Sequence, residues 1–327
     1  MEYNQFLNSI TECIQWKVDG EYEVKRNHIM KNNSIELDGI VFFKEGDNIS
    51  PNIYLNHYYS RYQNGESVDA IANEIIHLYH KGMEAKEVSD YQFEFTFESM
   101  KPVIVFRLVN YKQNKQFLTG VPHIRFLDLA ITFQCLVKHD GDGIGTVRIT
   151  NDHLVEWNVT VKELMQLASK NTKRLFPPKI RTMREVMVDI LKNDFNKVSG
   201  NDEEAVDHLS CNQDEEMEDL IAQLLGDKER VDSQVPMYVL SNESGINGAS
   251  AMLYNNELKQ FAMELDQDFY ILPSSIHEVI LVPFSKEIQR EQLMDMVKDV
   301  NMTQVPKEDI LSNKVYLYHR ETNVIEI

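Results

Sequence analysis

The stretch Pro236–Pro283 constrains the fold more than any other part of the chain, because its hydrophobic pattern changes period in a fixed order. Met237–Leu240, Phe269–Leu272 and Val279–Val282 are short apolar runs with the length of buried strands. Between the first two runs, apolar side chains recur at helical spacing at Tyr254, Leu258, Phe261, Ala262 and Leu265. The order predicts a strand, a helix and then two strands joined by a short turn.

The same alternation continues to the last residues. A second helix is predicted by the apolar positions Leu293, Met296, Val297 and Val300, and a turn begins at Pro306. Lys314–Arg320 and Asn323–Ile327 have the pattern of a closing hairpin. Residues 236–327 are therefore predicted to form a β-α-β-β-α-β-β unit, which is typical of an α+β fold with antiparallel or mixed sheets.

The first 86 residues predict a separate α-β-β-β-α domain. Its last helix has the clearest stripe in the chain, at Val68, Ile71, Ala72, Ile75, Ile76 and Tyr79. Ser67 is a good first residue for this helix, and Gly82 is expected to end it.

Residues 87–193 are predicted to form a central sheet followed by two helices. Alternating aromatic residues predict a half-covered strand at Tyr91–Phe97. Val103–Val109 is apolar except for Arg107, which favours a central strand. The long apolar run Ile124–Val137 has a pattern that fits a strand or a helix, and both alternatives stay open.

Two capping boxes mark where the helices of this central region begin. Thr160 is followed three residues later by Glu163, and Thr182 in the same way by Glu185. Pro177-Pro178 separates the two helices.

An acidic segment at residues 194–235 is expected to link the central domain to the C-terminal domain. Of the net charge of -19, the part between Asp194 and Asp232 contributes -10, with 13 acidic and 3 basic residues. One amphipathic helix is predicted inside it, with apolar positions Met217, Leu220, Ile221, Leu224 and Leu225. This helix either packs on its own domain or docks into a groove of a protein partner.

Composition excludes several classes of protein. An acidic chain without a basic stripe disfavours nucleic acid as a partner, since phosphate binding needs clustered lysine and arginine. We find no apolar run near the roughly 18 residues that span a membrane, and no secretory leader in the first residues. Three cysteines far apart indicate reduced thiols, so a soluble cytoplasmic protein is expected.

Metal and cofactor sites are not predicted. Glu74-x-x-His77 resembles half of a di-iron motif, but a second Glu-x-x-His is missing and His77 lies off the apolar stripe, which favours a surface histidine. Asp140–Gly145 resembles the start of a calcium loop but lacks its later ligands, so a hairpin turn is expected. The chain has no zinc-protease, phosphate-loop or dinucleotide motif.

The candidate site lies in two polar loops of the C-terminal unit. Asn247, Gly248 and Ser250 fall between a strand and a helix, where small residues let backbone N–H groups face an anion. The second loop contains Ser274, Ser275, His277 and Glu278. If the loops meet, a serine nucleophile with His277 as base is one interpretation. The other is a polar turn whose side chains bond to nearby backbone.

Several of these stretches together resemble an uncharacterised family of bacterial proteins known only as a domain of unknown function. The most specific pieces are PSSIHEVILVP at residues 273–283 and PPKIR at residues 177–181. The family occurs mainly in anaerobic Gram-positive bacteria, and the likeness extends over nearly the whole chain. It implies a soluble intracellular protein with an α+β build, and it implies no activity, cofactor or site.

The residues favour a protein that acts through protein–protein contacts without catalysis. The alternative is a small-molecule or anion-binding enzyme, similar to a hydrolase, that uses Asn247, Ser274 and His277.

Overall fold

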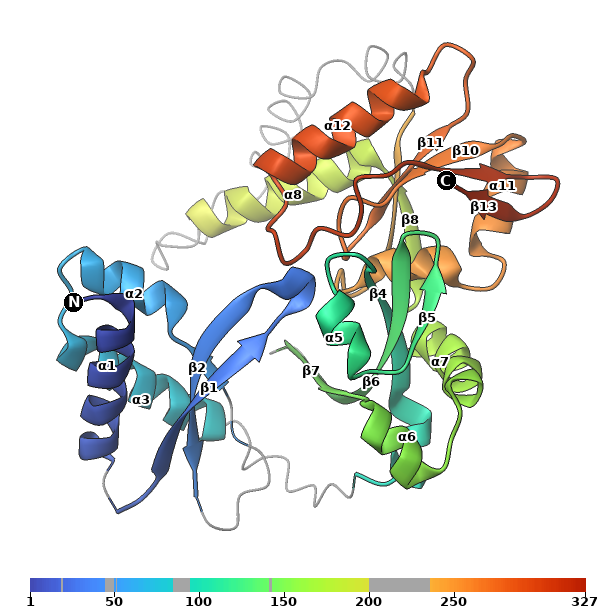
Figure 1. Cartoon of the computed structure of the whole chain (residues 1–327). Coiled ribbons are helices and arrows are strands. Elements are labelled where there is room, and N and C mark those ends of the chain that lie inside the picture. Colours follow the sequence, from blue (N-terminus) through green and yellow to red (C-terminus); the bar gives the residue numbers. More distant parts are fainter. Residues whose placement is uncertain (19, 45–49, 51, 85–94, 141–142, 200–235) are drawn as a thin grey trace, which may run out of the picture. The chain divides into compact units, whose positions relative to one another are not determined.

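The computed structural model describes residues 1–18, 20–44, 50, 52–84, 95–140, 143–199 and 236–327, without the side chains of 84, 138–140, 143 and 193–199. These residues form two compact units, Met1–Phe95 and Thr96–Ile327 (Figure 1). The fold is α+β, and the strand pairings in the described part of the chain are antiparallel. No described helix has the length and apolar character needed to cross a bilayer.

The first unit packs three helices against a three-stranded sheet. Its elements are α1 (Tyr3–Lys17), β1 (Glu23–Met30), η1 (Asn32–Ser34), β2 (Glu36–Phe43), β3 (Asn52–Tyr54), α2 (Asn56–Gln63) and α3 (Val68–Glu84). The predicted stripe is confirmed, since Ile71, Ala72 and Ile75 are buried. The Ser67 hydroxyl accepts a hydrogen bond from the Ala70 amide, as a capping residue does. The expected helix end at Gly82 is wrong, because α3 continues past it to Glu84, the last residue described before residue 95.

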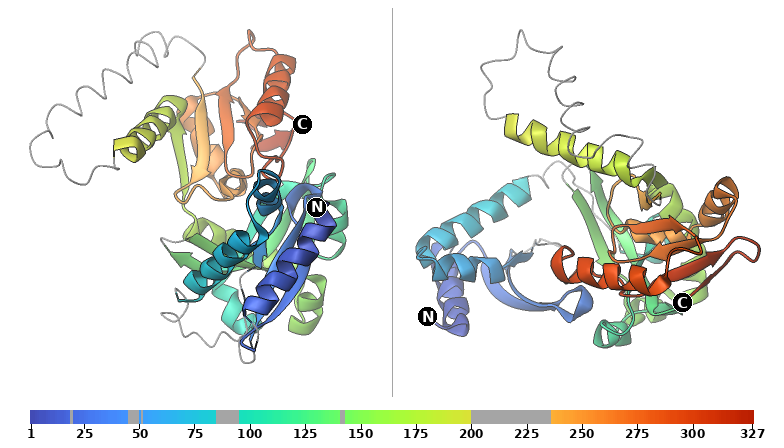
Figure 2. Two further views of the ribbon diagram at one scale, coloured as in Figure 1. Left: turned by 90° about the vertical axis from the view of Figure 1, so that its left-hand side faces the viewer. Right: turned by 90° about the horizontal axis from the view of Figure 1, so that it is seen from above.

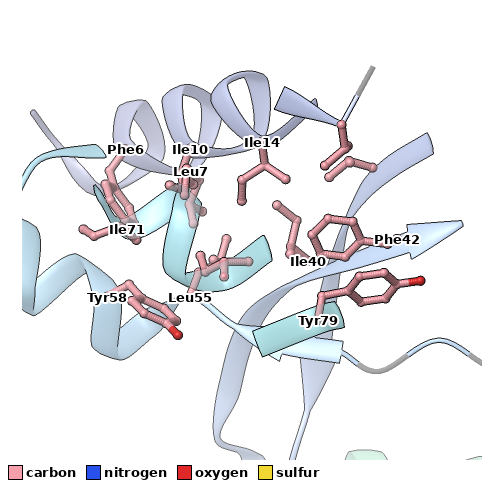
Figure 3. Close-up of a cluster of buried hydrophobic side chains, with 14 residues drawn as sticks. Phe6, Leu7, Ile10, Ile14, Ile40, Phe42, Leu55, Tyr58, Ile71 and Tyr79 are labelled. Carbon is pink, nitrogen blue, oxygen red and sulfur yellow. The ribbon is translucent and has the colours of Figure 1, made fainter. Parts of the chain in front are cut away.

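The core of this unit is one cluster, and most of its buried side chains come from α1, β2 and α3. Figure 3 shows Ile14 of α1 near Ile40 and Phe42 of β2, and Phe6 of α1 near Ile71 of α3. The Phe42 ring stacks on Tyr79 of α3, with 4.2 Å between ring centroids. Burial of a large apolar side chain contributes about 1.5–3 kcal/mol, so this cluster accounts for much of the unit's stability.

The second unit contains a four-stranded sheet. Its strands are β4 (Ile104–Asn110), β5 (His123–Phe126), β6 (Leu129–Asp140) and β7 (Gly143–Arg148). β6 pairs with β4 along one side, and with β5 and then β7 along the other. The hairpin expected at Asp140–Gly145 is confirmed by the pairing of β6 with β7, while residues 141–142 lie outside the described residues.

Two expectations for this sheet need correction. The strand predicted to be central, β4, lies at its edge, where the Thr172 hydroxyl accepts a hydrogen bond from the Phe106 amide at 3.0 Å. The run Ile124–Val137 is neither one strand nor a helix. It contains a hairpin, with Leu127 at φ 52° and Asp128 connecting β5 to β6.

Helices precede, interrupt and follow these strands along the chain. They are α4 (Phe97–Met100), η2 (Lys101–Val103), α5 (Lys115–Thr119), α6 (Asn151–Trp157) and α7 (Val161–Leu175). The capping box that begins α7 is confirmed, since Glu163 and Thr160 each accept a backbone hydrogen bond from the other. The strand predicted at Tyr91–Phe97 fails at its end, because Phe97 begins α4. Residues 91–94 lie outside the described residues.

A six-stranded sheet completes the second unit. Its order is β13 (Val324–Glu326), β12 (Tyr316–His319), β10 (Phe269–Leu272), β11 (Val279–Pro283), β9 (Tyr238–Asn242) and β8 (Pro178–Thr182). The predicted strands at Met237–Leu240, Phe269–Leu272 and Val279–Val282 are confirmed as β9, β10 and β11. β8 was not foreseen in the sequence. It comes from the predicted central region and pairs with β9, so one sheet contains strands from both sides of the acidic segment.

Helices η3 (Gly248–Leu253), α8 (Met183–Ser199), α11 (Glu257–Leu265) and α12 (Arg290–Thr303) pack around this sheet (Figures 1 and 2). α12 covers one face, where Leu293 and Val297 pack on Tyr270 and Val282. The predicted helix of residues 254–265 is shorter than expected. η3 ends at Leu253, Tyr254 follows it in an extended conformation, and α11 begins at Glu257.

Candidate functional site

Three chain segments meet at the Ser274–Glu278 turn, which connects β10 to β11. On one side the Ala249 amide donates to the Ile276 carbonyl at 3.2 Å. On the other side the Ile276 amide donates to the Asp309 carbonyl at 2.8 Å, and the Leu311 amide to the Ser274 carbonyl at 2.8 Å. The two predicted loops therefore do meet, and a third segment, Asp309–Ser312, joins them.

We call the place where these three segments meet the junction. Gly248 allows the closest approach between backbone segments in it. A Cβ atom built on it would lie 2.1 Å from Ser241 Oγ and 2.3 Å from the His277 carbonyl oxygen. No side chain fits such a space. The preceding Asn247 has φ 52°, in the left-handed region that asparagine tolerates better than most residues. The small residues at this loop thus serve the packing of one backbone segment against another.

His277 bridges the two neighbours of the turn. Its Nδ1 atom lies 3.4 Å from the Asn247 amide nitrogen, and its Nε2 atom lies 3.3 Å from Asp309 Oδ1. A neutral imidazole with its proton on Nε2 accepts from the Asn247 N–H and donates to the Asp309 carboxylate. The ring is partly exposed, so the arrangement connects loops at the surface.

The serines of the turn bond to backbone. Ser275 is 4% exposed, and its Oγ accepts a hydrogen bond from the His277 amide at 3.0 Å. The neighbouring Ser241 Oγ donates to the His277 carbonyl at 2.7 Å. Ser274 takes part through its backbone carbonyl, which accepts a hydrogen bond from the Leu311 amide. Hydroxyl groups used in this way hold the shape of a turn.

Ser250 and Glu278 complete the set of predicted residues. Ser250 is 1% exposed, and its Oγ has no hydrogen-bond partner among the described residues. Glu278 is partly buried at the end of the turn, directly before β11. Neither residue contacts the His277 imidazole through a hydrogen bond in the described part of the chain.

The chemistry that this junction supports is limited. A serine nucleophile requires its Oγ within hydrogen-bond reach of a base. Among the described residues, the hydrogen bond between Ser275 and His277 joins a hydroxyl to a backbone amide, and no serine Oγ is bonded to the imidazole. The geometry brings a histidine and a carboxylate together but leaves the serine turned to the backbone.

The sequence interpretation missed two residues of this junction. Asp309 contacts His277 from a segment that precedes β12, and Ser241 reaches the same residue from β9. Both lie more than 30 positions from His277, and no local pattern indicated the contact. The polar run that contains Asp309 predicted a turn and nothing more.

Other candidates from the sequence are placed as follows. Met217, Leu220, Ile221, Leu224 and Leu225 lie outside the described residues. His77 is exposed, as predicted, and Glu74 forms an ion pair with Arg61 at 2.6 Å. No group of three metal-ligating side chains occurs in the part of the chain that the structure describes.

The fold and the junction define an α+β protein built from three antiparallel sheets, in which a polar turn is fixed by its neighbours. The chain belongs to a family of unknown function, DUF5688, whose model matches residues 3–320. The expectation from the sequence that the chain belongs to a family of unknown function is thereby confirmed. Neither the curated proteins nor the solved structures contain a match to this chain.

Proposed function

We propose that the protein acts by binding another protein and not by catalysing a reaction. The observation that carries this proposal is the exposed apolar surface of α8. Met187 is 41% exposed and Ile190 is 53% exposed, and none of the side chains described for residues 183–192 is buried. A helix of a single folded domain usually buries its apolar stripe in its own core.

Met187 and Ile190 are three residues apart and therefore share one face of the helix. Covering each of them would contribute up to about 1.5–3 kcal/mol. An amphipathic helix that docks in an apolar groove uses anchors with this spacing. The partner is a protein with an apolar groove and a basic rim, because α8 leads directly into the acidic segment of charge -10.

The predicted helix around Leu220 offers a second contact to the same partner. Its apolar positions recur at helical spacing among acidic residues, as in the sequence pattern of a groove-binding peptide. A partner that covers both α8 and this segment would bury a larger surface than either alone.

Binding through α8 is tested with Met187→Asp and Ile190→Asp, compared with Lys192→Asp, an exposed polar position of the same helix. The tagged full chain is used to capture partners from a lysate of the source cell, and quantitative mass spectrometry compares the variants. We expect one protein to be captured by the wild type and by Lys192→Asp. The captured amount of this protein should fall at least tenfold with Met187→Asp and with Ile190→Asp.

Folding of every variant is checked by circular dichroism, and the oligomeric state by light scattering. Equal capture by all variants would contradict the proposal. A partner that turns out to be a second copy of the chain would replace the groove-bearing protein with a homodimer. Leu220→Asp tests the second contact in the same assay, and the proposal expects a folded protein with weakened capture.

A hydrolase at Asn247, Ser274 and His277 is the alternative, and the contacts of the junction speak against it. Ser275 accepts from a backbone amide, and the His277 imidazole is held between Asn247 and Asp309. A nucleophile held by backbone in this way would first have to leave its turn. Hydrolysis of an activated ester that disappears in both Ser275→Ala and His277→Gln would restore the enzyme interpretation.

A cytoplasmic location is part of the proposal. Cys13 and Cys135 are both free thiols. Burial raises the pKa of the Cys135 thiol to about 12, and burial also raises the pKa of Cys13. Such thiols stay protonated and react slowly. Thiol counting on freshly purified protein is expected to find reduced cysteines, and a disulfide in that sample would contradict this location.

A further inference from the structure

Strand β1 lies at the edge of the three-stranded sheet, and its outer side is open. It pairs with β2 over all of its eight residues, and no other described strand pairs with it. Directly beyond the last pair, the Lys31 amide donates to the Ile35 carbonyl at 2.7 Å. Antiparallel pairs alternate between bonded and non-bonded, so the odd-numbered residues of β1 bond to β2. The even-numbered residues therefore point their N–H and C=O groups outward.

A side chain satisfies the first of these outward groups, and the next three residues are open. The Val24 amide donates to Gln15 Oε1 at 2.8 Å, which agrees with the outward direction of the even-numbered residues. The backbone N–H and C=O groups of Arg26, His28 and Met30 have no hydrogen-bond partner among the residues that the structure describes. The side chains of residues 25–28 are exposed, so the edge is accessible along this stretch.

Two other edge strands of the chain, β4 and β8, are protected. On β4 the Phe106 amide donates to the Thr172 hydroxyl at 3.0 Å. On β8, Pro178 has no N–H group, and the Thr182 amide donates to Glu185 Oε2 at 2.8 Å. Folded proteins protect their sheet edges because an unpaired edge is a template for another strand. The open edge of β1 is a surface to which an extended segment can add a strand.

The side chains along this edge are mostly basic. Residues 23–31 contain three basic residues and one acidic residue, in a chain whose net charge is -19. Lys25 is 53% exposed and pairs with Glu23 at 2.9 Å. Arg26 is exposed, and its Nη1 donates to the uncharged Asn8 side chain at 2.9 Å. Arg26 forms no ion pair among the described residues, so its charge is available to a partner.

A strand added to this edge meets these charges first. Residues directly opposite each other on neighbouring strands have Cβ atoms about 4.5–5.5 Å apart. The carboxylates of Glu36 and Asp38 are on β2, two strand spacings or about 10 Å away, and both lie against His28. Opposite charges stabilise cross-strand pairs, and like charges destabilise them. A second copy of β1 would bring the same positive charge, so the complementary strand is an acidic one.

We propose that the open edge of β1 binds an extended, acidic segment of another protein as an added strand. Main-chain hydrogen bonds to Arg26, His28 and Met30 supply the affinity, as in other cases of strand addition. Carboxylates opposite Lys25 and Arg26 select the segment. β1 belongs to the first unit and α8 to the second, so this surface is separate from α8 and does not depend on it.

Hydrogen exchange of the full chain, followed by NMR, tests the proposal residue by residue. The probe is an end-capped synthetic peptide of about eight residues, within the usual length of a strand, made of valine and threonine with two adjacent glutamates at its centre. Without peptide, we expect fast exchange at the outward amides of Arg26, His28 and Met30, and slow exchange at the odd-numbered amides between them. Saturating peptide should slow the outward amides at least tenfold and leave the others unchanged.

Charge variants test how the segment is selected. Lys25→Glu combined with Arg26→Glu should lower the affinity for the acidic peptide at least tenfold. Lys259→Glu, at an exposed position of α11, is the matched control and should not. A peptide with lysine in place of glutamate should bind the doubly substituted protein better than the wild type. A purely structural role of Lys25 and Arg26 would not produce this exchange of preference.

A backbone variant tests the hydrogen bonds themselves. His28→Pro removes one outward N–H group without removing a bond between β1 and β2, and proline is tolerated at such edge positions. His28→Gln keeps the amide and serves as its control. We expect His28→Pro to weaken peptide binding and His28→Gln to retain it, with folding of both checked by circular dichroism.

Three outcomes would overturn the proposal. The first is the absence of saturable binding up to about 10 mM peptide, which corresponds to negligible affinity. The second is equal binding of the acidic and the lysine peptide to the wild type. The third is slow exchange of the outward amides without peptide, which would show that the edge is already occupied. Its dependence on protein concentration would then distinguish a second copy from a segment of the same chain.

Discussion

The hydroxyl of Tyr316 donates a hydrogen bond to Asp128 Oδ1 at 2.5 Å, across 188 positions of sequence. Asp128 lies in the turn between β5 and β6, and Tyr316 begins β12. The second carboxylate oxygen accepts from Ser312 Oγ at 2.7 Å. Burial, and then the charge of Asp128, raise the pKa of Tyr316 above its ordinary value, so the phenol stays a donor at neutral pH. The pair connects the two sheets of the second unit.

Tyr316→Phe is expected to lower the free energy of unfolding by about 1.5–3 kcal/mol, the range for a buried hydrogen bond to a charged group. The measurement is urea unfolding followed by circular dichroism. Tyr318→Phe in the same strand is the control, because Tyr318 donates to the neutral Asn323 side chain at 3.0 Å. A larger loss of unfolding free energy in Tyr318→Phe than in Tyr316→Phe would contradict the prediction that the hydrogen bond to Asp128 contributes more.

Gly248→Ala is expected to destabilise the junction around His277 by about 1–3 kcal/mol or more, because the added methyl group must displace backbone atoms. Gly120→Ala is the control, since its Cβ would meet nothing nearer than 3.9 Å and its φ of -94° suits any residue. Both are compared by thermal unfolding. Equal stability of the two variants would show that the loops around Gly248 and His277 can move apart without destabilising the protein.

His319 makes the closing hairpin sensitive to pH. Its Nε2 lies 3.0 Å from Glu326 in β13, and its Nδ1 lies 3.2 Å from Asp268 before β10. The hydrogen bond to Glu326, and next that to Asp268, raise the pKa of His319. A raised pKa in the folded state gives stabilisation that is full below the unfolded value of about 6.5 and is lost as pH rises through the folded pKa.

We therefore expect hydrogen-exchange protection of the β13 amides, corrected for the intrinsic exchange rate, to decrease as pH rises above about 6.5. His319→Gln should remove this dependence and leave the protection near the high-pH level of the wild type. The imidazole titration followed by NMR gives the pKa directly. A His319 pKa at or below the ordinary histidine value would refute the prediction.

Ile10→Ala in α1 is expected to cost the first unit about 2–5 kcal/mol, because Ile10 is fully buried in a packed cluster. Glu12→Ala on the exposed face of the same helix should change stability by less than about 0.5 kcal/mol. Hydrogen exchange of α1 and α3 measures both. Equal exchange in the two variants would contradict the burial of Ile10.

Local patterns predicted the helices of this protein well. The stripe at Val68–Tyr79 predicted α3, and the boxes at Thr160 and Thr182 predicted where α7 and α8 begin. Each of these signals acts between residues within a few positions of one another. Their success reflects interactions that do not depend on the rest of the fold.

The run Ile124–Val137 shows why other parts could not be predicted. Its turn contains Leu127 at φ 52°, and an apolar branched residue gives no turn signal in a sequence. The turn is fixed by Asp128, whose partners Ser312 and Tyr316 lie far along the chain. A conformation held by distant contacts is invisible to any local pattern.

The junction was predicted only in part, because it also depends on contacts between residues far apart in the sequence. The two polar loops were predicted from composition, but their meeting depends on β9 lying next to β11. Arg107 was visible in the sequence as the one polar residue of an apolar strand. That β4 lies at the edge of its sheet emerged only from the pairing of β6 with three other strands.

The pairing of β8 with β9 has a consequence for how this family can vary. Thr182 is opposite Tyr238, and the Met183 amide donates to the Met237 carbonyl at 2.8 Å, so the chain departs from the sheet and returns to it at one point. The stretch between Thr182 and Met237 therefore begins and ends at neighbouring positions of the sheet. Doubling the length of a loop that is closed at its two ends costs only about 0.6 kcal/mol in loop-closure entropy. Relatives can therefore lengthen, shorten or exchange that stretch while the six strands keep their order.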